Sequence, residues 1–174
     1  MIKGFFGEYE CKLDDKNRLV LPARLKSEIT SENNEEEITL ILCKGFEPCL
    51  NLYLPSTWES VILEKMRQLD FYHSEHRALQ RTFLGGSTEV SMDKTGRILL
   101  PRLMQKYALL EKDLLIVGVD QRIEIWNPDK YQEYILTGEQ FSQAAHEYLT
   151  KPTIQPISKV FNISLQENQS KAVD

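Results

Sequence analysis

Two ten-residue segments of this chain repeat one pattern of acidic, basic and apolar residues. The first reads LDDKNRLVLP over residues 13–22, and the second reads MDKTGRILLP over residues 92–101. Their arginines, Arg18 and Arg97, are suited to two kinds of contact. A guanidinium neutralises phosphate, and its forked donors can bind the O6 and N7 atoms of guanine. The pattern therefore points first to the binding of nucleic acid.

Each arginine directly follows a residue that favours a sharp turn. Asn17 stands before the first arginine and Gly96 before the second, and these two residue types tolerate a positive φ angle best. Asp14 and Asp93 stand three positions ahead of them, where a carboxylate can accept hydrogen bonds from nearby backbone amides. We expect two tight turns, each organised by its aspartate and each presenting its arginine immediately afterwards.

The two segments are basic, although the chain as a whole is acidic. The net charge is −5, but residues 12–26 hold five basic and two acidic side chains, and residues 93–106 hold four basic and one acidic. An acidic total argues against a protein that binds nucleic acid over its whole surface, whereas local basicity fits a confined contact. The binding prediction is therefore restricted to the two segments.

We expect the basic side chains of these segments to have different roles. Arg18 and Arg97 are assigned to base edges, because a residue beside a turn reaches out without a long flexible arm. The side chains assigned to phosphate are Lys16, Arg24, Lys94 and Arg102. The aspartates are expected to orient the turns, since carboxylates repel phosphates. The alternative for each Asp–Arg pair is an ordinary surface salt bridge that contributes little. Duplication of the whole set favours binding.

The bulk composition predicts a protein of the cytoplasm. Of the 174 residues 41% are hydrophobic, and no apolar run approaches the roughly 18 residues of a membrane span. The N-terminal residues lack the apolar segment and cleavage site of a signal peptide. Three cysteines without close spacing favour a reduced compartment. We therefore expect no membrane association.

No motif in the sequence predicts an enzyme, a metal site or a cofactor. His73 and His76 stand three residues apart without a partner cluster, so we interpret them as surface residues. Cys43 and Cys49 lie in or beside expected strands, and we interpret them as small core residues.

The repeat extends beyond the turns and predicts an α+β fold. Each half has the pattern of a strand, a turn, a second strand, a proline and a short helix, followed by two buried strands and a further helix. The turn segments begin at positions 13 and 92, and a later pair of similar blocks occupies 50–58 and 123–131. The first half thus has six additional residues between its two blocks, which fit the acidic stretch 31–37. We expect the two strand–turn–strand units to share one core.

This doubled pattern resembles the MraZ family, over roughly residues 4–138. Family-like segments stand at residues 7–9, 21–24, 80–86 and 115–119. Members of that family carry two tandem AbrB-like (SpoVT/AbrB) swapped-hairpin units. The resemblance implies that these units form one pseudo-twofold β-barrel with flanking helices. Asn17 replaces the glycine that is usual in the family, and asparagine can adopt the same conformation.

For function, the resemblance implies a transcriptional regulator of the cytoplasm and nucleoid that assembles into a ring of identical subunits. Such proteins bind short direct repeats of double-stranded DNA in the promoter of their own operon, which encodes division and cell-wall functions, and usually repress it. The residues that match the family's DNA-contacting motif are Asp14, Lys16, Arg18, Asp93, Lys94 and Arg97. The alternative is a protein-interaction module, such as an antitoxin-like protein, built on the same barrel.

The expected organisation has five parts. These are AbrB-like repeat 1 at residues 7–57, linking helices at 58–85, AbrB-like repeat 2 at 86–130, C-terminal helices at 131–150 and a disordered tail at 151–174. The tail is rich in serine, glutamine and asparagine, a composition that favours disorder.

Overall fold

The computed structural model describes residues 3–31 and 37–150, so the predicted tail at 151–174 lies outside the described residues. One compact unit ends at Tyr134, and a second begins at Ile135. The first half contains β1 (Phe5–Lys12), β2 (Arg18–Val20), α1 (Ala23–Thr30), β3 (Ile38–Lys44), β4 (Cys49–Tyr53), α2 (Pro55–Thr57), the π-helix η1 (Trp58–Leu63), α3 (Glu64–Arg67) and α4 (Ser74–Leu84). The second half contains β5 (Thr88–Met92), β6 (Arg97–Leu99), α5 (Arg102–Tyr107), β7 (Asp113–Asp120), β8 (Arg122–Trp126) and α6 (Pro128–Tyr134), and the second unit contains α7 (Gly138–Leu149).

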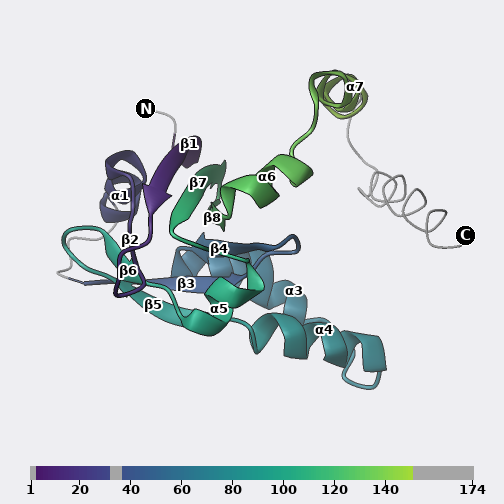
Figure 1. The fold of residues 1–174 in the computed structure, drawn as a ribbon. Coiled ribbons are helices and arrows are strands. Elements are labelled where there is room, and N and C mark those ends of the chain that lie inside the picture. The colour runs from purple at the N-terminus through teal and green to yellow at the C-terminus, as the bar shows by residue number, and fades with distance from the viewer. Residues whose placement is uncertain (1–2, 32–36, 151–174) are drawn as a thin grey trace, which may run out of the picture. The chain divides into compact units, whose positions relative to one another are not determined.

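The eight strands form one antiparallel sheet that curls into a nearly closed barrel (Figure 1). The strand order is β1-β7-β8-β4-β3-β5-β6-β2, so β1 and β2 stand at its two ends. An antiparallel bridge between Leu13, directly after β1, and Leu19 in β2 joins these ends. The barrel is therefore nearly closed, and beyond this bridge no strand among the described residues pairs with the outer edge of β1 or β2.

The two halves exchange strands, which confirms the swapped-hairpin barrel. β1 of the first half pairs along its whole length with β7 of the second, and β5 of the second half pairs with β3 of the first. β2 pairs with β6, and β4 pairs with β8. If the two halves are interchanged, the β1–β7 pairing corresponds to β5–β3, and the β2–β6 and β4–β8 pairings each correspond to themselves. This correspondence is the pseudo-twofold symmetry of the barrel. Within each turn segment the hairpin pairing is one residue pair long, Leu13 with Leu19 and Met92 with Ile98.

Aliphatic side chains of both halves fill the barrel. Leu19 and Ile98, the central residues of β2 and β6, are fully buried together with Ile116 and Ile125. Burying a side chain of this size contributes about 1.5–3 kcal/mol to folding. Four strand pairings (β1–β7, β2–β6, β3–β5 and β4–β8) join the two halves, so apolar side chains of both halves meet in one core.

The helices that follow the strands differ in regularity. Pro22 and Pro101 have extended backbone and stand directly ahead of α1 and α5. The helical region after β4 is not one regular α-helix, since α2, the π-helix η1 and α3 follow one another there. Trp58 in η1 stacks on Phe83 of α4, with ring centroids 5.7 Å apart, and both pack with residues of β3 and β4.

β8 contains a charged pair in which Glu124 is buried and Arg122 is partly exposed. The Glu124 carboxylate accepts hydrogen bonds from Nε and Nη2 of Arg122, at 2.9 and 2.7 Å, and from Nε1 of Trp126 at 2.9 Å. Cys43 and Cys49 are buried too, and burial raises the pKa of both thiols, that of Cys43 to about 12. These cysteines are therefore protonated packing residues at neutral pH.

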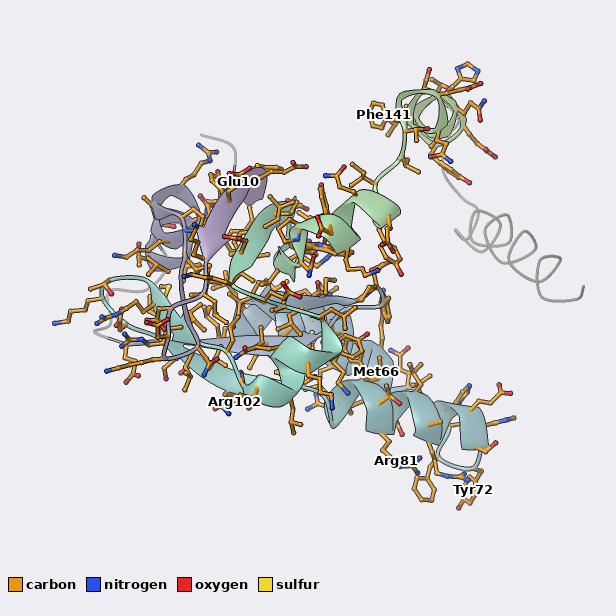
Figure 2. All side chains as sticks on the ribbon, viewed as in Figure 1. Glu10, Met66, Tyr72, Arg81, Arg102 and Phe141 are labelled. Carbon is orange, nitrogen blue, oxygen red and sulfur yellow. The ribbon has the colours of Figure 1, made fainter. Side chains whose placement is uncertain are left out.

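In the second unit, α7 begins with a capping box. The Thr137 side chain accepts a hydrogen bond from the first helical turn, and the Thr137 N–H donates to Oε1 of Gln140 at 3.0 Å. Phe141 is exposed on this helix (Figure 2).

Candidate nucleic-acid interface

The first turn is built around the carboxylate of Asp14. Its Oδ1 atom accepts hydrogen bonds from the backbone N–H groups of Lys16 at 2.9 Å and of Arg18 at 2.8 Å. The Asp14 carbonyl accepts a further hydrogen bond from the N–H of Asn17 at 2.9 Å. Asn17 has a φ of 59°, the left-handed conformation. The backbone thus reverses at Asn17 and continues directly into Arg18.

The second turn repeats this arrangement with one additional contact. Oδ1 of Asp93 accepts hydrogen bonds from the N–H groups of Thr95 at 2.8 Å and of Arg97 at 3.0 Å. It also accepts one from the Thr95 hydroxyl at 2.6 Å. Gly96 has a φ of 84°, and its N–H donates to the Asp93 carbonyl at 2.8 Å. Asn17 and Gly96 therefore both adopt the positive φ angle that this turn requires.

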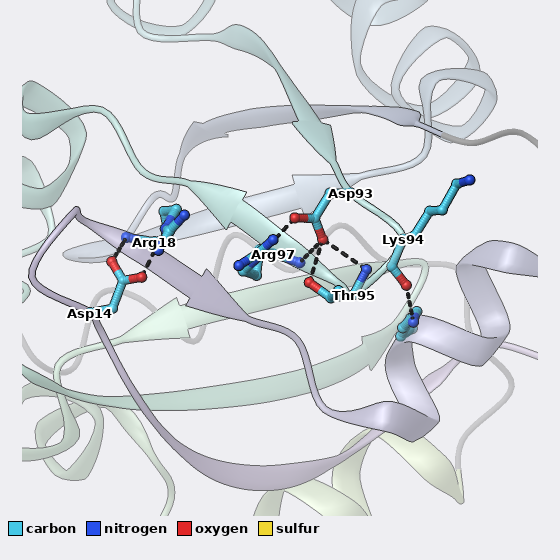
Figure 3. Close-up of polar contacts among 7 residues, drawn as sticks. Asp14, Arg18, Asp93, Lys94, Thr95 and Arg97 are labelled. Atoms are coloured by element: carbon cyan, nitrogen blue, oxygen red, sulfur yellow. Dashed lines mark hydrogen bonds and ion pairs between the residues drawn. The ribbon is translucent and has the colours of Figure 1, made fainter.

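In each turn the second carboxylate oxygen fixes the arginine side chain. Nε of Arg18 donates to Oδ2 of Asp14 at 2.8 Å, and Nε of Arg97 donates to Oδ2 of Asp93 at 2.7 Å (Figure 3). Within the part of the chain that the structure describes, neither guanidinium uses its terminal Nη groups in a hydrogen bond. The two side chains are 34% and 42% exposed, so these donors are accessible to a ligand.

The same hydrogen bonds favour the ionised form of both aspartates. The backbone N–H of Arg18 is the largest cause that lowers the pKa of Asp14, and the Thr95 hydroxyl is the largest that lowers the pKa of Asp93. Each carboxylate therefore keeps its charge at neutral pH. An ionised carboxylate bonded at Nε orients the guanidinium and leaves its outer edge to donate.

The arginines lie on a two-stranded ribbon made of β2 and β6. The opposed pairs are Arg18 with Leu99, Leu19 with Ile98, and Val20 with Arg97. Alternate residues of a strand point to opposite faces. Leu19 and Ile98 point into the core, where they are fully buried. We name the opposite, outward set the ribbon face: Arg18, Val20, Arg97 and Leu99.

Contacts between the halves fix this ribbon. The N–H of Leu21 donates to the carbonyl of Gly96, and the N–H of Leu100 donates to that of Asn17, both at 2.9 Å. Nζ of Lys26 in α1 also donates to a backbone carbonyl of the second turn (Figure 3). Each turn is thus held by chain from the other half, so both arginines belong to one connected element.

The other predicted contact residues lie within a few positions of β2 or β6 along the chain. Lys16 and Lys94 are exposed residues of the first and second turns. Arg24 is exposed in the first turn of α1, and Arg102 is the first residue of α5 (Figure 2). These two arginines are not counterparts, because Arg24 is the second residue after its proline and Arg102 is the first after its own. The structure therefore brings Arg18 and Arg97 together on one face and leaves Arg24 and Arg102 on separate helices.

Three residues of this region are not predicted from the sequence: Val20, Leu99 and Thr95. The two aliphatic residues are 51% and 58% exposed on the ribbon face. A signal for them was available, because each stands two positions after an arginine and residues i and i+2 of a strand share a face. The Thr95 contact had no such signal, since threonine is common in turns for several reasons.

Other kinds of site find less support among the described residues. No group of three or more histidine, cysteine, aspartate or glutamate side chains is arranged there to hold a metal ion. None of the helices within residues 3–31 and 37–150 is long and apolar enough to span a bilayer.

Comparison with known proteins links this geometry to a family. The family model named MraZ protein, whose description also carries the term antitoxin-like, matches residues 5–82 and again residues 83–151. Proteins named transcriptional regulator MraZ are similar over most of their length. The one from Cytophaga hutchinsonii is 40% identical over 148 residues, 84% of this chain and 95% of the relative. Those from Moorella thermoacetica and Clostridium tetani are 37% identical over 144 residues (82% and 95%) and 38% identical over 130 residues (75% and 86%).

Proposed function

This chain belongs to the MraZ family, and on that basis we propose that it is a transcriptional regulator that binds double-stranded promoter DNA through its ribbon face. Its relatives' shared name, transcriptional regulator MraZ, supports the regulatory role. In this proposal it represses its own division and cell-wall operon by binding short direct repeats in the promoter. It does so as a ring-shaped homo-oligomer in the cytoplasm, at the nucleoid.

Two aspartate-fixed arginines on one outward ribbon face carry this proposal. The major groove is about 12 Å wide and admits a two-stranded β-ribbon. Arg18 and Arg97 are held at Nε, so little side-chain freedom remains to be lost on binding. Their outer donors match the O6 and N7 atoms of guanine, and each such bidentate contact contributes about 1–3 kcal/mol of base discrimination.

The bordering cations have a second role in this proposal. Lys16 and Lys94 in the turns, and Arg24 and Arg102 on the helices, contact phosphates on either side of the groove. Such contacts position the ribbon and add affinity without reading sequence. They also make binding weaker as salt rises.

A single ribbon covers few base pairs, so oligomerisation supplies the remaining affinity. When one subunit has bound a repeat, its neighbours in the ring meet the next repeats at high effective concentration. Regular spacing of the repeats is then as important as the sequence of each one.

A binding titration tests the proposal directly. The probe is a fluorescent duplex of the DNA immediately upstream of the coding sequence, compared with a scrambled duplex of equal length. Arg18→Ala and Arg97→Ala should each weaken binding to the promoter by about 5- to 150-fold, with little change on the scrambled duplex. Arg81→Ala is the matched control, because it removes an exposed arginine from α4, away from the ribbon (Figure 2). Unchanged promoter affinity in the double arginine variant would refute the assignment.

Lys16→Ala gives a second readout of the same proposal. Loss of one phosphate contact should weaken binding to both duplexes alike and reduce the slope of log affinity against log salt by about 1. A protein-interaction or antitoxin-like module predicts the opposite result: a stable protein partner in a pull-down, and no salt-dependent DNA binding.

A further inference from the structure

The ribbon face contains two exposed aliphatic side chains as well as two arginines. Val20 is 51% exposed and Leu99 is 58% exposed. Single exposed aliphatic residues are common on protein surfaces and need no explanation. These two are different because they occupy equivalent positions of the two repeated segments, on the one surface that also presents the fixed arginines.

Strand pairing places each aliphatic residue directly beside an arginine. Leu99 lies opposite Arg18, and Val20 lies opposite Arg97. Opposed residues of an antiparallel pair have Cβ atoms about 4.5–5.5 Å apart. That separation is comparable with the rise of one to two base pairs, about 3.4 Å each. A ribbon lying in the major groove would therefore bring both members of a pair to neighbouring base edges.

The major groove offers one apolar group to such a side chain. All four bases present hydrogen-bonding atoms there, but only thymine also presents a methyl group, at its C5 atom. We infer that Val20 and Leu99 contact thymine 5-methyl groups. Each thymine then lies next to the guanine that the opposing arginine reads. The inference rests on the proposed function and defines the operator more closely, as guanine with an adjacent thymine.

Replacing thymine by deoxyuridine tests this contact without altering any hydrogen bond. The probe is the same promoter duplex with all thymines within the footprint of the protein replaced by deoxyuridine. The wild-type chain should bind it about fourfold more weakly for each methyl group contacted, which corresponds to about 0.8 kcal/mol per buried carbon. In the Val20→Ala Leu99→Ala variant the two duplexes should bind equally. The control Leu79→Ala, which shortens an exposed leucine of α4, should keep the full difference.

The possible failures are distinguishable. If the wild-type chain binds the promoter duplex specifically but does not discriminate deoxyuridine, the methyl contact is refuted and the proposed function stands. If it binds neither duplex above the scrambled control, the proposed function fails, and the inference fails with it. If the double variant changes the oligomeric mass in light scattering while keeping the methyl discrimination, the two residues form a contact between subunits and the inference is overturned.

Discussion

Gly96→Ala should destabilise the protein more than Asn17→Ala does at the equivalent position. Gly96 has a φ of 84°, beyond the usual left-handed range, and it is buried. An L-residue in the left-handed conformation costs about 1–2 kcal/mol. The new Cβ would also lie 3.1 Å from Cδ of Lys26, so that side chain must shift. Since Lys26 donates to a carbonyl of this turn, we add about 0.5 kcal/mol for the weakened hydrogen bond. The expected loss is about 2 kcal/mol.

Substitutions at Asn17 should follow a different order. Its φ of 59° is close to the ideal left-handed value. Asn17→Ala should therefore cost about 1 kcal/mol, and Asn17→Gly should change stability by no more than about 0.5 kcal/mol in either direction. Gly138→Ala is the matched control for a new methyl group, because nothing lies within 4 Å of that position.

Urea unfolding at pH 7 and fixed protomer concentration measures these differences. The fixed concentration is needed because the proposed oligomerisation would contribute to the apparent stability. Promoter affinity provides a second readout, since displacement of the second turn moves Arg97. The reasoning would be refuted by a Gly96→Ala variant within about 0.5 kcal/mol of wild type, the range of an ordinary surface substitution. It would also be refuted if Asn17→Gly proved less stable than Asn17→Ala.

Two further predictions concern acid and the buried charge. The folded-state pKa values of Asp14 and Asp93 lie below the ordinary value of 3.8. Their stabilising contribution is therefore present above about pH 4 and is lost as pH falls below it. Wild-type stability should fall more steeply from pH 5 to pH 2 than that of the Asp14→Asn Asp93→Asn variant, as urea unfolding at each pH would show; parallel profiles would contradict this. Glu124→Ala should cost about 2 kcal/mol in the same assay, because it leaves Trp126 Nε1 and the partly exposed Arg122 without their acceptor. An unchanged unfolding midpoint would argue against it.

The sequence predicts the local elements of this fold well because their causes are local. Alternating apolar residues predict the strands, and the prolines predict the starts of α1 and α5. The pairing of β1 with β7 is different, since a strand–turn–strand segment equally fits a hairpin within one half. Only the resemblance to a swapped-hairpin family implied the exchange. Its physical reason is that every residue of β1 finds a partner in β7, whereas its own hairpin offers one bridge.

The six additional residues of the first half show the same limit. Leu42 pairs with Leu52, and at the equivalent place in the second half Ile116 pairs with Ile125. The chain between the paired residues is thus one residue longer in the first half, in the turn between β3 and β4. The other five additional residues therefore lie between Pro22 and β3. From the sequence alone, all six residues were placed in the acidic stretch. A change in composition reveals a large insertion, whereas one additional residue in a turn leaves no such signal.

The part of the candidate site whose chemistry depends on a single turn could be predicted from the sequence. Aspartate, a left-handed residue and arginine at fixed spacing define each turn by themselves. The ribbon face was not predictable, because it exists only when β2 and β6 pair. Val20 and Leu99 then become neighbours of arginines from the opposite half of the chain. Register between distant strands determines these contacts, and no local pattern specifies it.

The differences between the two turns explain how a ribbon with pseudo-twofold symmetry could recognise the direct repeats of the proposed operator. A ribbon with two identical strands would bind a DNA site equally well in both orientations, which suits a palindrome and not a repeat with one direction. Here Lys16 in the first turn is the counterpart of Thr95 in the second, and Thr95 has no charge and donates its hydroxyl to Asp93. Val20 and Leu99 differ in reach by one carbon. In the proposed complex the shared arginines would provide the contact, and the unequal neighbours would give the ribbon a direction on DNA.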